Sequence, residues 1–397
     1  MSIEMGVGFS ADANVLSAGQ QAAEQVLSHL AGQRPDLTLV FSSIRFADLR
    51  LLKGIRSVTS NAPLIGCTDA GGIMASGPKR RSVTVIGLIA KGGYFMTGVG
   101  RHMARQAQQA GEMLGRAFTK KSIADAKALL MFPDGLASDG SAVLSGVQKI
   151  IGERIPIAGA SAADDFYFQK TFQFFDDEIL TDSVPGALFC GDIAMGFGAR
   201  HGWIPLGQPR RVTRVSGHVI HQLDKRPAIS IYEDYLGLKR EECVQESLAH
   251  LAMTYPLGAS MEGQSEYVLR DAIRVGRAGS LICTGEIPRG TAVRIMIGGY
   301  ESALEAAQQA ACEAAEQIGR SRLKGALVFC GVGRQKMLGS EFQGEIDVIR
   351  DALGGSGVRM GGFYGYGELA PVNLEGRTKG RVRNMFHNES VVVMALG

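Results

Sequence analysis

One stretch near the C-terminus concentrates side chains that could bind a small molecule. Residues 358–371, VRMGGFYGYGELAP, read as a strand ending in glycines, so the backbone can come close to a bound group. Tyr364, Tyr366 and the carboxylate of Glu368 stand beside these glycines. The G-x-x-x-x-G-K-[ST] spacing of a phosphate loop is missing. The stretch therefore predicts a binding wall for a small ligand and not a nucleotide site.

Three small nucleophiles follow apolar segments and raise the alternative of an enzyme. Cys67, Ser161 and Cys330 are placed as nucleophiles on tight turns would be, with His387 or His201 as the base. The chain lacks the G-x-S-x-G elbow and the cysteine-protease signatures, and no carboxylate has an orienting role. A hydrolase that uses Cys67 or Ser161 stays an alternative, and small buried thiols are the simpler interpretation.

These side chains belong to a pattern that occurs three times. Residues 37–43, LTLVFSS, predict a buried strand, 45–60 a helix, and 63–73 a second strand that ends in a glycine turn. In each copy the first strand carries a phenylalanine and the second has an apolar-x-Gly form. The other copies comprise 128–135, 138–153 and 156–166, and then 326–332, about 340–353 and 358–369.

The repeats indicate the fold class. Each copy is followed by an apolar strand-like segment, at 83–90, 187–198 and 391–396. We therefore predict an α/β protein (mixed α+β) of two domains, built from repeated strand–helix–strand units whose mixed sheets are covered by helices. The segment 202–211, with two prolines and two glycines, marks a boundary. The predicted domains are 1–208, with two copies, and 209–397, with the third.

The composition excludes several classes of protein. There are 42 basic and 39 acidic residues without a long basic run, which argues against a nucleic-acid partner. The chain lacks the apolar run of about 18 residues that membrane insertion needs, and its start does not resemble an export signal. The 6 cysteines show neither a C-x-x-C pair nor a metal-ligand spacing, which is typical of reduced thiols in a cytoplasmic protein.

Several of these segments resemble the motifs of the FIST family. The resemblance covers nearly the whole chain and implies a FIST N-terminal domain followed by a FIST C-terminal domain. In the first half the matching segments are GCTDAGGI (66–73), PIAGASAADDF (156–166) and HGWIPLG (201–207). In the second half they are residues 212–232, FCGVGRQKMLG (329–339), and GFYGYGELAP (362–371) followed by FHNES (386–390).

The resemblance implies a non-catalytic bacterial input protein for signal transduction that binds a small ligand. A pair of domains without an output domain resembles a subgroup of haem-bound nitric-oxide sensors. This implies haem b as cofactor and a histidine kinase or diguanylate cyclase as partner, and it is compatible with a homo-oligomer. Ligand binding would shift the two domains or a loop around 377–383, and the partner would respond to that change.

Six residues of the second half match the family motifs and become ligand-binding candidates. Arg334 could hold a carboxylate and Glu368 an ammonium, which suits an amino-acid-like ligand without haem. The alternative is that Arg334 pairs with Glu368, while His387 and Asn388 close a turn. The six candidates are Arg334, Tyr364, Tyr366, Glu368, His387 and Asn388.

Two further sets of candidates come from the first half and from the histidines. Cys67, Thr68 and Asp69 are polar where the second copy has Ser161, Ala162 and Ala163, which favours a ligand contact or a turn that needs Asp and Gly. Haem iron needs a strong protein ligand, most often histidine. His201, near Trp203, and His387, beside Phe386, have apolar neighbours and are the expected haem ligands. We expect no separate metal site.

Overall fold

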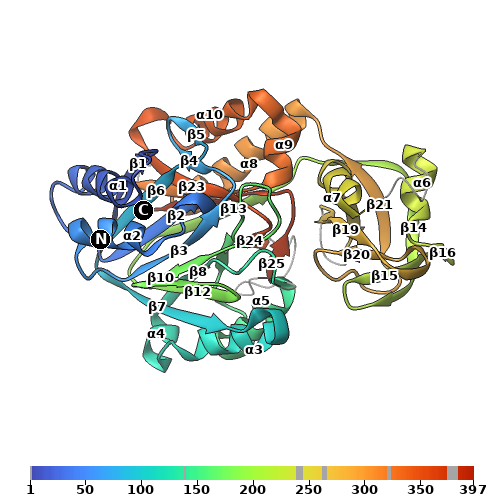
Figure 1. Ribbon diagram of the computed structural model, residues 1–397, viewed down its shortest axis with the longest axis horizontal. Helices are drawn as coiled ribbons and strands as arrows, with labels where there is room; N and C mark the ends of the chain where they lie inside the picture. The colour runs from blue at the N-terminus through green and yellow to red at the C-terminus, as the bar shows by residue number, and fades with distance from the viewer. Residues whose placement is uncertain (1, 138–139, 238–244, 262–265, 320–322, 373–382) are drawn as a thin grey trace.

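The structure is a computed structural model that describes residues 2–137, 140–237, 245–261, 266–319, 323–372 and 383–397. Two parts are visible in Figure 1, and we call them the core body (2–203 and 298–397) and the inserted lobe (204–297). The predicted loop at 377–383 lies outside the described residues, apart from Arg383. The boundary predicted between residues 208 and 209 falls inside one strand, and it stays a prediction.

The core body consists of three copies of one unit, as the sequence repeats predict. Each unit starts with a strand and a helix, continues as strand–helix–strand, and ends with a hairpin and a last strand. The first comprises β1 (Ser2–Ser10), α1 (Val15–His29), β2 (Leu37–Ser43), α2 (Leu49–Thr59), β3 (Leu64–Asp69), β4 (Gly72–Met74), β5 (Gly77–Lys79) and β6 (Val83–Lys91). The second comprises β7 (Gly93–Arg101), α3 (Met103–Arg116), α4 (Lys120–Asp125), β8 (Ala126–Met131), α5 (Gly140–Ile151), β9 (Ile157–Ala160), β10 (Gln173–Phe175), β11 (Glu178–Leu180) and β12 (Ser183–Gly191).

The third unit is interrupted by the inserted lobe, which lies between its first strand and its first helix. It comprises β13 (Met195–Arg200), α8 (Tyr300–Ile318), β22 (Gly325–Gly331), α9 (Val332–Leu338), α10 (Gln343–Ala352), β23 (Arg359–Gly365), β24 (Glu368–Val372), β25 (Arg383–His387) and β26 (Val391–Leu396). The predicted binding wall at 358–371 is thus two strands, β23 and β24, which belong to different sheets.

Each unit contributes its hairpin to the sheet of another unit. The sheets have the orders β1-β6-β2-β3-β10-β11, β7-β12-β8-β9-β24-β25 and β13-β26-β22-β23-β4-β5. In each sheet one pair of strands is parallel, β2 with β3, β8 with β9 and β22 with β23, and the other pairs are antiparallel. The hairpin of the first unit completes the third sheet, that of the second completes the first, and that of the third completes the second. None of the three sheets is complete within its own unit.

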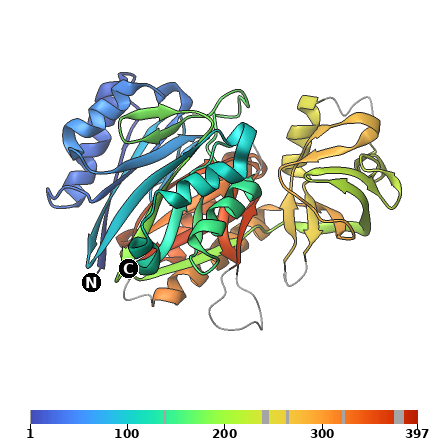
Figure 2. The same ribbon diagram turned by 90° about the horizontal axis from the view of Figure 1, so that it is seen from below.

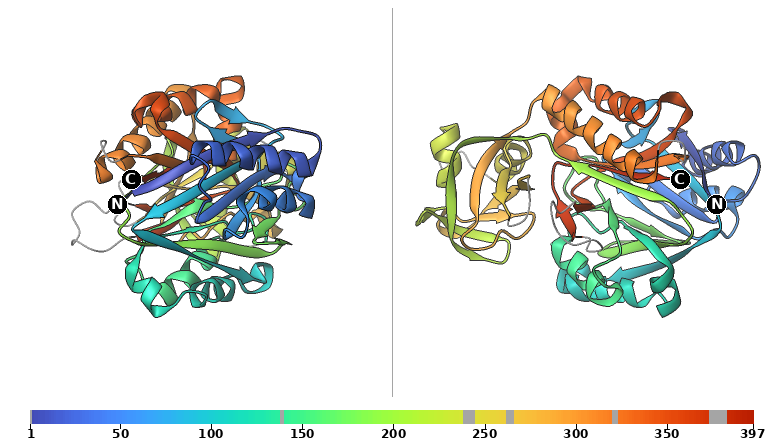
Figure 3. Two further views of the ribbon diagram at one scale, coloured as in Figure 1. Left: turned by 90° about the vertical axis from the view of Figure 1, so that its left-hand side faces the viewer. Right: turned by 180° about the vertical axis from the view of Figure 1, so that it is seen from behind.

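The three sheets meet on a cluster of phenylalanines. Phe41, Phe132 and Phe329 follow the same pattern in the three first-repeat strands, and their ring centroids lie 5.1, 5.9 and 6.3 Å apart in edge-to-face contacts. Phe363 packs on all three rings. The helices cover the outer faces, as predicted, and the left view of Figure 3 shows them gathered at three corners. The same packing is visible from below in Figure 2.

Three equivalent glycines explain the apolar-x-Gly form of the second strands. A Cβ atom on Gly66, Gly159 or Gly362 would lie 1.8, 2.1 or 1.7 Å from a carbonyl oxygen of the neighbouring parallel strand. No side chain fits there without moving the backbone. The glycines therefore let each parallel pair approach closely.

The inserted lobe is attached by a two-stranded ribbon, β14 (Ile204–Ser216) paired with β21 (Ala292–Ile297). Its other elements are β15 (Val219–Leu223), β16 (Arg226–Pro227), α6 (Ser230–Leu236), α7 (Gln245–Thr254), β17 (Leu257–Ser260), β18 (Val268–Arg270), β19 (Ala272–Val275) and β20 (Leu281–Cys283). The sheet closes on its own apolar core, which includes Val212, Ile220, Leu257 and Ile295. A search of the described helices finds none with the length and apolar character of a membrane span.

We expect Gly362→Ala to lower the free energy of unfolding by more than about 2 kcal/mol, because the added methyl group overlaps a backbone oxygen. Gly357→Ala is the control, since nothing lies within 4 Å of the Cβ position there. Urea denaturation followed by circular dichroism measures both. Equal stability of the two variants would contradict the close approach of strand β23 to β22 at Gly362.

Candidate functional site

The structure places Cys67, Thr68 and Asp69 at the buried end of β3. Gly66 lies opposite Val40 and Gly159 opposite Met131, so Cys67 corresponds to Ala160 and Thr68 to Ser161. The correspondence predicted from the sequence is therefore wrong by one residue. The equivalent glycines, which allow close approach of the strands, define the alignment of the two copies. The polar residues beside them do not define it.

These three side chains make structural contacts. Thr68 Oγ1 accepts from Phe172 N at 3.0 Å, and Asp69 Oδ1 accepts from Gly71 N at 2.9 Å, as a turn residue does. Burial raises the pKa of the Asp69 carboxyl well above its ordinary value, and the charge of Asp165 adds to the effect. Burial also raises the pKa of the Cys67 and Cys330 thiols well above their ordinary value. These cysteines keep their protons, and the structure offers no activated thiolate at either position.

Arg334 binds the two core-body segments that flank the lobe ribbon. It is fully buried on α9, and its Nε donates to Glu345 Oε1 at 2.5 Å. Its Nη1 donates to the carbonyl oxygen of His201, where the chain leaves the core body. Its Nη2 donates to the carbonyl oxygen of Ala303 at 2.8 Å, where the chain has returned. The partner of Arg334 is thus Glu345 and not Glu368, and every nitrogen of the guanidinium is engaged within the protein.

The tyrosines and Asn388 also have defined partners. Tyr364 OH donates to Glu345 Oε2 at 3.0 Å and completes the network of Arg334. Tyr366 OH donates to Asp164 Oδ1, and its ring stacks on Phe168 with centroids 4.7 Å apart. Asn388 Oδ1 accepts from Thr284 Oγ1 of the inserted lobe at 2.8 Å. Asn388 therefore contributes to the contact between lobe and core body, which the sequence did not indicate.

At this contact β18 of the lobe lies against β25 of the core body. Arg270 Nη1 donates to the carbonyl oxygen of Phe386 at 3.0 Å. Three buried carboxyl groups, Asp271, Glu368 and Glu389, gather beside it, and each has one oxygen without a hydrogen-bond partner among the described residues. Glu368 uses its other oxygen to accept from Ser390 N at 2.9 Å. We call this meeting of β18 with β25 and residues 388–390 the junction.

The buried carboxyl groups of the junction favour their protonated forms. Burial raises the pKa of Asp271 to about 7, and it raises the pKa of Glu368 and Glu389 well above the ordinary value. Mutual repulsion among the three groups raises the pKa of Glu368 and Glu389 further. The protonated forms of Asp271 in the lobe and of Glu389 in the core body reduce the electrostatic repulsion between them.

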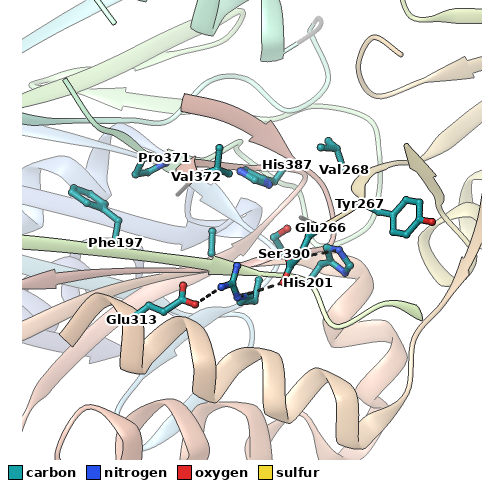
Figure 4. A pocket seen from close by; sticks show the side chains of 12 residues that line it. Phe197, His201, Glu266, Tyr267, Val268, Glu313, Pro371, Val372, His387 and Ser390 are labelled. Atoms are coloured by element: carbon teal, nitrogen blue, oxygen red, sulfur yellow. Dashed lines mark hydrogen bonds and ion pairs between the residues drawn. The ribbon is translucent and has the colours of Figure 1, made fainter. Parts of the chain in front are cut away.

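His201 and His387, the two histidines selected from the sequence, both line a small cavity at the junction. Its volume is about 40 Å³, and Figure 4 shows His201, His387 and Glu266 around it. His201 Nδ1 accepts from Trp203 N at 2.9 Å, and its Nε2 lies 3.8 Å from Glu266 Oε2. Burial lowers the pKa of His201 to about 4 and that of His387 to about 3. Both imidazoles are therefore uncharged at neutral pH.

The small cavity does not fit haem. An uncharged imidazole is the form that binds iron, but cofactor sites occupy about 300–1,000 Å³. A cavity of about 40 Å³ holds a few molecules of the size of water. Among the residues that the structure describes, no group of three or more His, Cys, Asp and Glu side chains could hold a metal ion.

A second and larger cavity lies on the other side of β25. It is an open groove of about 460 Å³ between α5, β25 and Arg270, and its size is typical of a small-molecule site. Its wall from β25 runs from Arg383 to Phe386, and its lining contains neither histidine nor cysteine. The sequence did not indicate this groove, because Arg270 and α5 carry no recognisable motif.

The chain matches two domain models of one family. The FIST N domain model matches residues 36–226 and the FIST C domain model residues 228–371. The chain is 24% identical over 387 residues to the uncharacterized protein Rv0628c of Mycobacterium tuberculosis (strain ATCC 25618 / H37Rv), covering 93% of this chain and 95% of that one. It is 23% identical over 389 residues to the uncharacterized protein Mb0898c of Mycobacterium bovis, with the same coverage. A solved structure of cyanuric acid hydrolase from A. caulinodans aligns over 99% of both chains, but with 9% identity and a TM-score of 0.34 it carries no argument.

We expect Arg334→Leu to lower the free energy of unfolding by about 3–5 kcal/mol, because Glu345 is left as a buried charge without its partner. Arg226→Leu is the control, since its ion pair with Asp234 is half exposed and should change stability by less than about 1 kcal/mol. Guanidinium denaturation measures both. Equal effects would show that the buried network does not stabilise the fold.

We expect Asp271→Asn to be more stable than the parent at pH 8 and to have a flatter stability profile. The folded pKa of Asp271, about 7, lies above the unfolded value of about 3.9. Its stabilising contribution is complete below pH 4 and is lost as the pH rises through 7. An asparagine amide is uncharged at every pH and does not lose this contribution, so we expect a gain of roughly 1–3 kcal/mol at pH 8.

Denaturation curves from pH 4 to pH 9 test this prediction. Glu286→Gln, which changes an exposed carboxylate of the same lobe, is the control and should follow the parent profile. A profile for Asp271→Asn that stays parallel to the parent would exclude a proton at the junction.

Proposed function

The chain belongs to the FIST family, and from this premise we propose that it is a non-catalytic sensory protein whose ligand acts at the junction. FIST domains are sensor domains of signal transduction. The observation that carries the proposal is the position of the cavities. Both are lined by residues of the core body and of the inserted lobe, on either side of β25.

The attachment of the lobe supports a change in its position on ligand binding. It is joined to the core body through the ribbon of β14 and β21, and it contacts β25 through Arg270 and Asn388 through Thr284. A ligand that contacts both parts favours one lobe position over the others by its difference in affinity. A histidine kinase or diguanylate cyclase that touches the lobe would respond to that shift.

The chemistry of the candidate nucleophiles supports a protein without catalysis. The Cys67 and Cys330 thiols are buried, and their raised pKa keeps them protonated. The two uncharged histidines line the small cavity and not the segments that carry the cysteines. The proposal therefore does not include a hydrolase that uses Cys67 as its nucleophile.

The proposal includes neither haem nor a clamp for an amino acid. The histidine cavity is too small for a macrocycle, and the groove offers Met385 but no histidine. Arg334 donates to groups of the protein, so it does not serve a ligand carboxylate. A saturable one-to-one Soret band in a haem titration, lost on changing His201 or His387, would contradict this part.

Hydrogen–deuterium exchange of the full chain tests the proposal. Compounds that raise the melting temperature are selected first, because a ligand specific for the folded state stabilises it. We expect such a compound to change exchange in segments 266–271 and 383–390, which meet at the junction. Thr284→Val, which removes a contact of the lobe, should raise exchange at the same segments without ligand. Compounds that bind and leave both segments unchanged would refute a sensor acting through the lobe.

A further inference from the structure

The first strand of each unit in the core body lies at the edge of its sheet. These strands are β1, β7 and β13, and each pairs with the last strand of its own unit. The outward backbone groups of an edge strand have no partner within the sheet, so another strand can pair with them. The three units differ in whether side chains cover this edge.

In the first unit, two side chains of α1 cover the edge of β1. Gln25 accepts from Phe9 N at 3.1 Å, and its amide donates to the carbonyl oxygen of Phe9 at 2.7 Å. His29 Nδ1 accepts from Val7 N at 3.3 Å. The outward backbone groups at this end of β1 are therefore satisfied within the protein.

In the third unit, one side chain of α8 covers the edge of β13 in the same way. Gln317 accepts from Phe197 N at 3.0 Å, and its amide donates to the carbonyl oxygen of Phe197 at 2.6 Å. A glutamine side chain suits this position, because it carries both a donor and an acceptor.

The second unit has apolar residues at the equivalent positions. One close contact between strand and helix aligns the three units. A Cβ atom on Gly8, Gly198 or Gly100 would lie 1.8, 1.9 or 2.0 Å from the carbonyl oxygen of Ala22, Ala310 or Ala110. Counted from these alanines, Gln25 corresponds to Met113 of α3. His29 and Gln317 both correspond to Ala117. Neither Met113 nor Ala117 can donate a hydrogen bond to the backbone of β7.

The outward backbone groups of β7 follow from its pairing with β12. The carbonyl oxygen of Pro185 in β12 accepts from Phe132 N, so Pro185 points away from β7. Val99 lies opposite Pro185, and opposite residues of an antiparallel pair point the same way relative to each other, so the N–H and C=O of Val99 point outward. By alternation the same holds for Phe95 and Thr97.

The edge of β7 is open over its whole length. Within the part of the chain that the structure describes, β7 pairs with β12 alone, and no side chain hydrogen-bonds to its backbone. Val99 is half-buried, whereas the equivalent Val7 and Phe197 are buried. Met113 and Tyr94 are 43% and 37% exposed, so apolar surface adjoins the open edge.

The other edges of the core sheets are short or covered. β5 and β11 have three residues each, and β25 is contacted by Arg270 of the lobe. Natural edge strands are protected from pairing by charges, prolines, bulges or short length. β7 has nine residues, no proline and no register shift against β12, and Arg101 at its end is its only charged residue.

We propose that β7 pairs antiparallel with β7 of a second copy of this chain and forms a dimer with a two-fold axis. An antiparallel pair of identical strands is self-complementary, since each outward donor meets an outward acceptor. With the axis at Thr97, the middle residue, Thr97 faces its own copy and Phe95 faces Val99, and both are favourable cross-strand pairs. Arg101 then faces Gly93, so no like charges meet.

The uncharged edge favours a second copy over a strand of another protein. Charges at an interface select a particular partner, and β7 offers none before Arg101. The dimer joins two sheets edge to edge, and β25 lies at the opposite end of each sheet. Both junctions therefore stay at the outer ends of the dimer, and the pairing does not depend on the sensory role.

Sedimentation velocity of the full chain tests the dimer at concentrations from about 1 to about 200 µM, which cover the affinities of interfaces of modest size. We expect the parent to dimerise within this range. Ala117→Gln should weaken the dimer at least about tenfold, because the new amide can bind Val99 as Gln317 binds Phe197. Leu49→Gln, which changes an exposed leucine of α2, is the control and should dimerise as the parent does.

A proline variant tests the strand pairing itself. Thr97→Pro removes an outward donor but no hydrogen bond to β12, so it should abolish the dimer while circular dichroism stays that of the parent. Thr97→Val keeps the backbone donor and should retain the dimer. If Thr97→Pro fails to fold, Ala117→Gln still decides the question, because Ala117 is exposed.

Hydrogen–deuterium exchange locates the interface. We expect exchange of segment 93–101 to slow as the protein concentration rises, whereas exchange of segment 2–10 stays constant because side chains already cover β1. A chain that stays monomeric at about 200 µM overturns the proposal and leaves the edge to an extended segment of another protein. A dimer that Ala117→Gln does not weaken, or that leaves exchange at 93–101 unchanged, also overturns it.

Discussion

The buried guanidinium of Arg334 is the interaction on which the arrangement of the two parts depends. An ion pair without exposure to water costs free energy unless every hydrogen-bonding group is satisfied. Here Glu345, Tyr364 and two carbonyl oxygens satisfy it. Those carbonyl groups belong to His201, just before the ribbon begins, and to Ala303 in α8, just after it ends, so Arg334 holds the two ends of the ribbon on the core body.

The core body provides a rigid surface for that junction. Each sheet needs the hairpin of another unit, so loss of one unit leaves two sheets incomplete. The glycines let the parallel strands within each sheet approach closely, and the phenylalanine cluster packs between the three sheets. Strands β24 and β25 therefore belong to the framework of the protein although they carry the residues of the junction.

The sequence predicted the repeated units and their helical cover, because alternation of apolar strands and helices is a local pattern. It could not predict the exchange of hairpins, since a hairpin has the same local pattern whichever sheet it completes. His201 and His387 were selected separately as haem ligands for their apolar neighbours, and tertiary structure brings them to one cavity. Asp271 and Glu389 carry no mutual signal, because residues so far apart in the chain meet only through tertiary structure. Arg334 was predicted to bind a ligand carboxylate or to pair with Glu368, whereas its partner in the structure is Glu345.

The place of the lobe within the third unit has a consequence for the history of the chain. In the first two units the same connection, from the first strand to the first helix, takes residues 11–14 or residue 102 alone, whereas in the third it takes residues 201–299. The framework of three sheets thus closes without any contribution from the lobe. Insertions and substitutions in that segment can alter what is recognised while selection on the framework stays unchanged, so members of one lineage can keep a common scaffold and diverge in specificity.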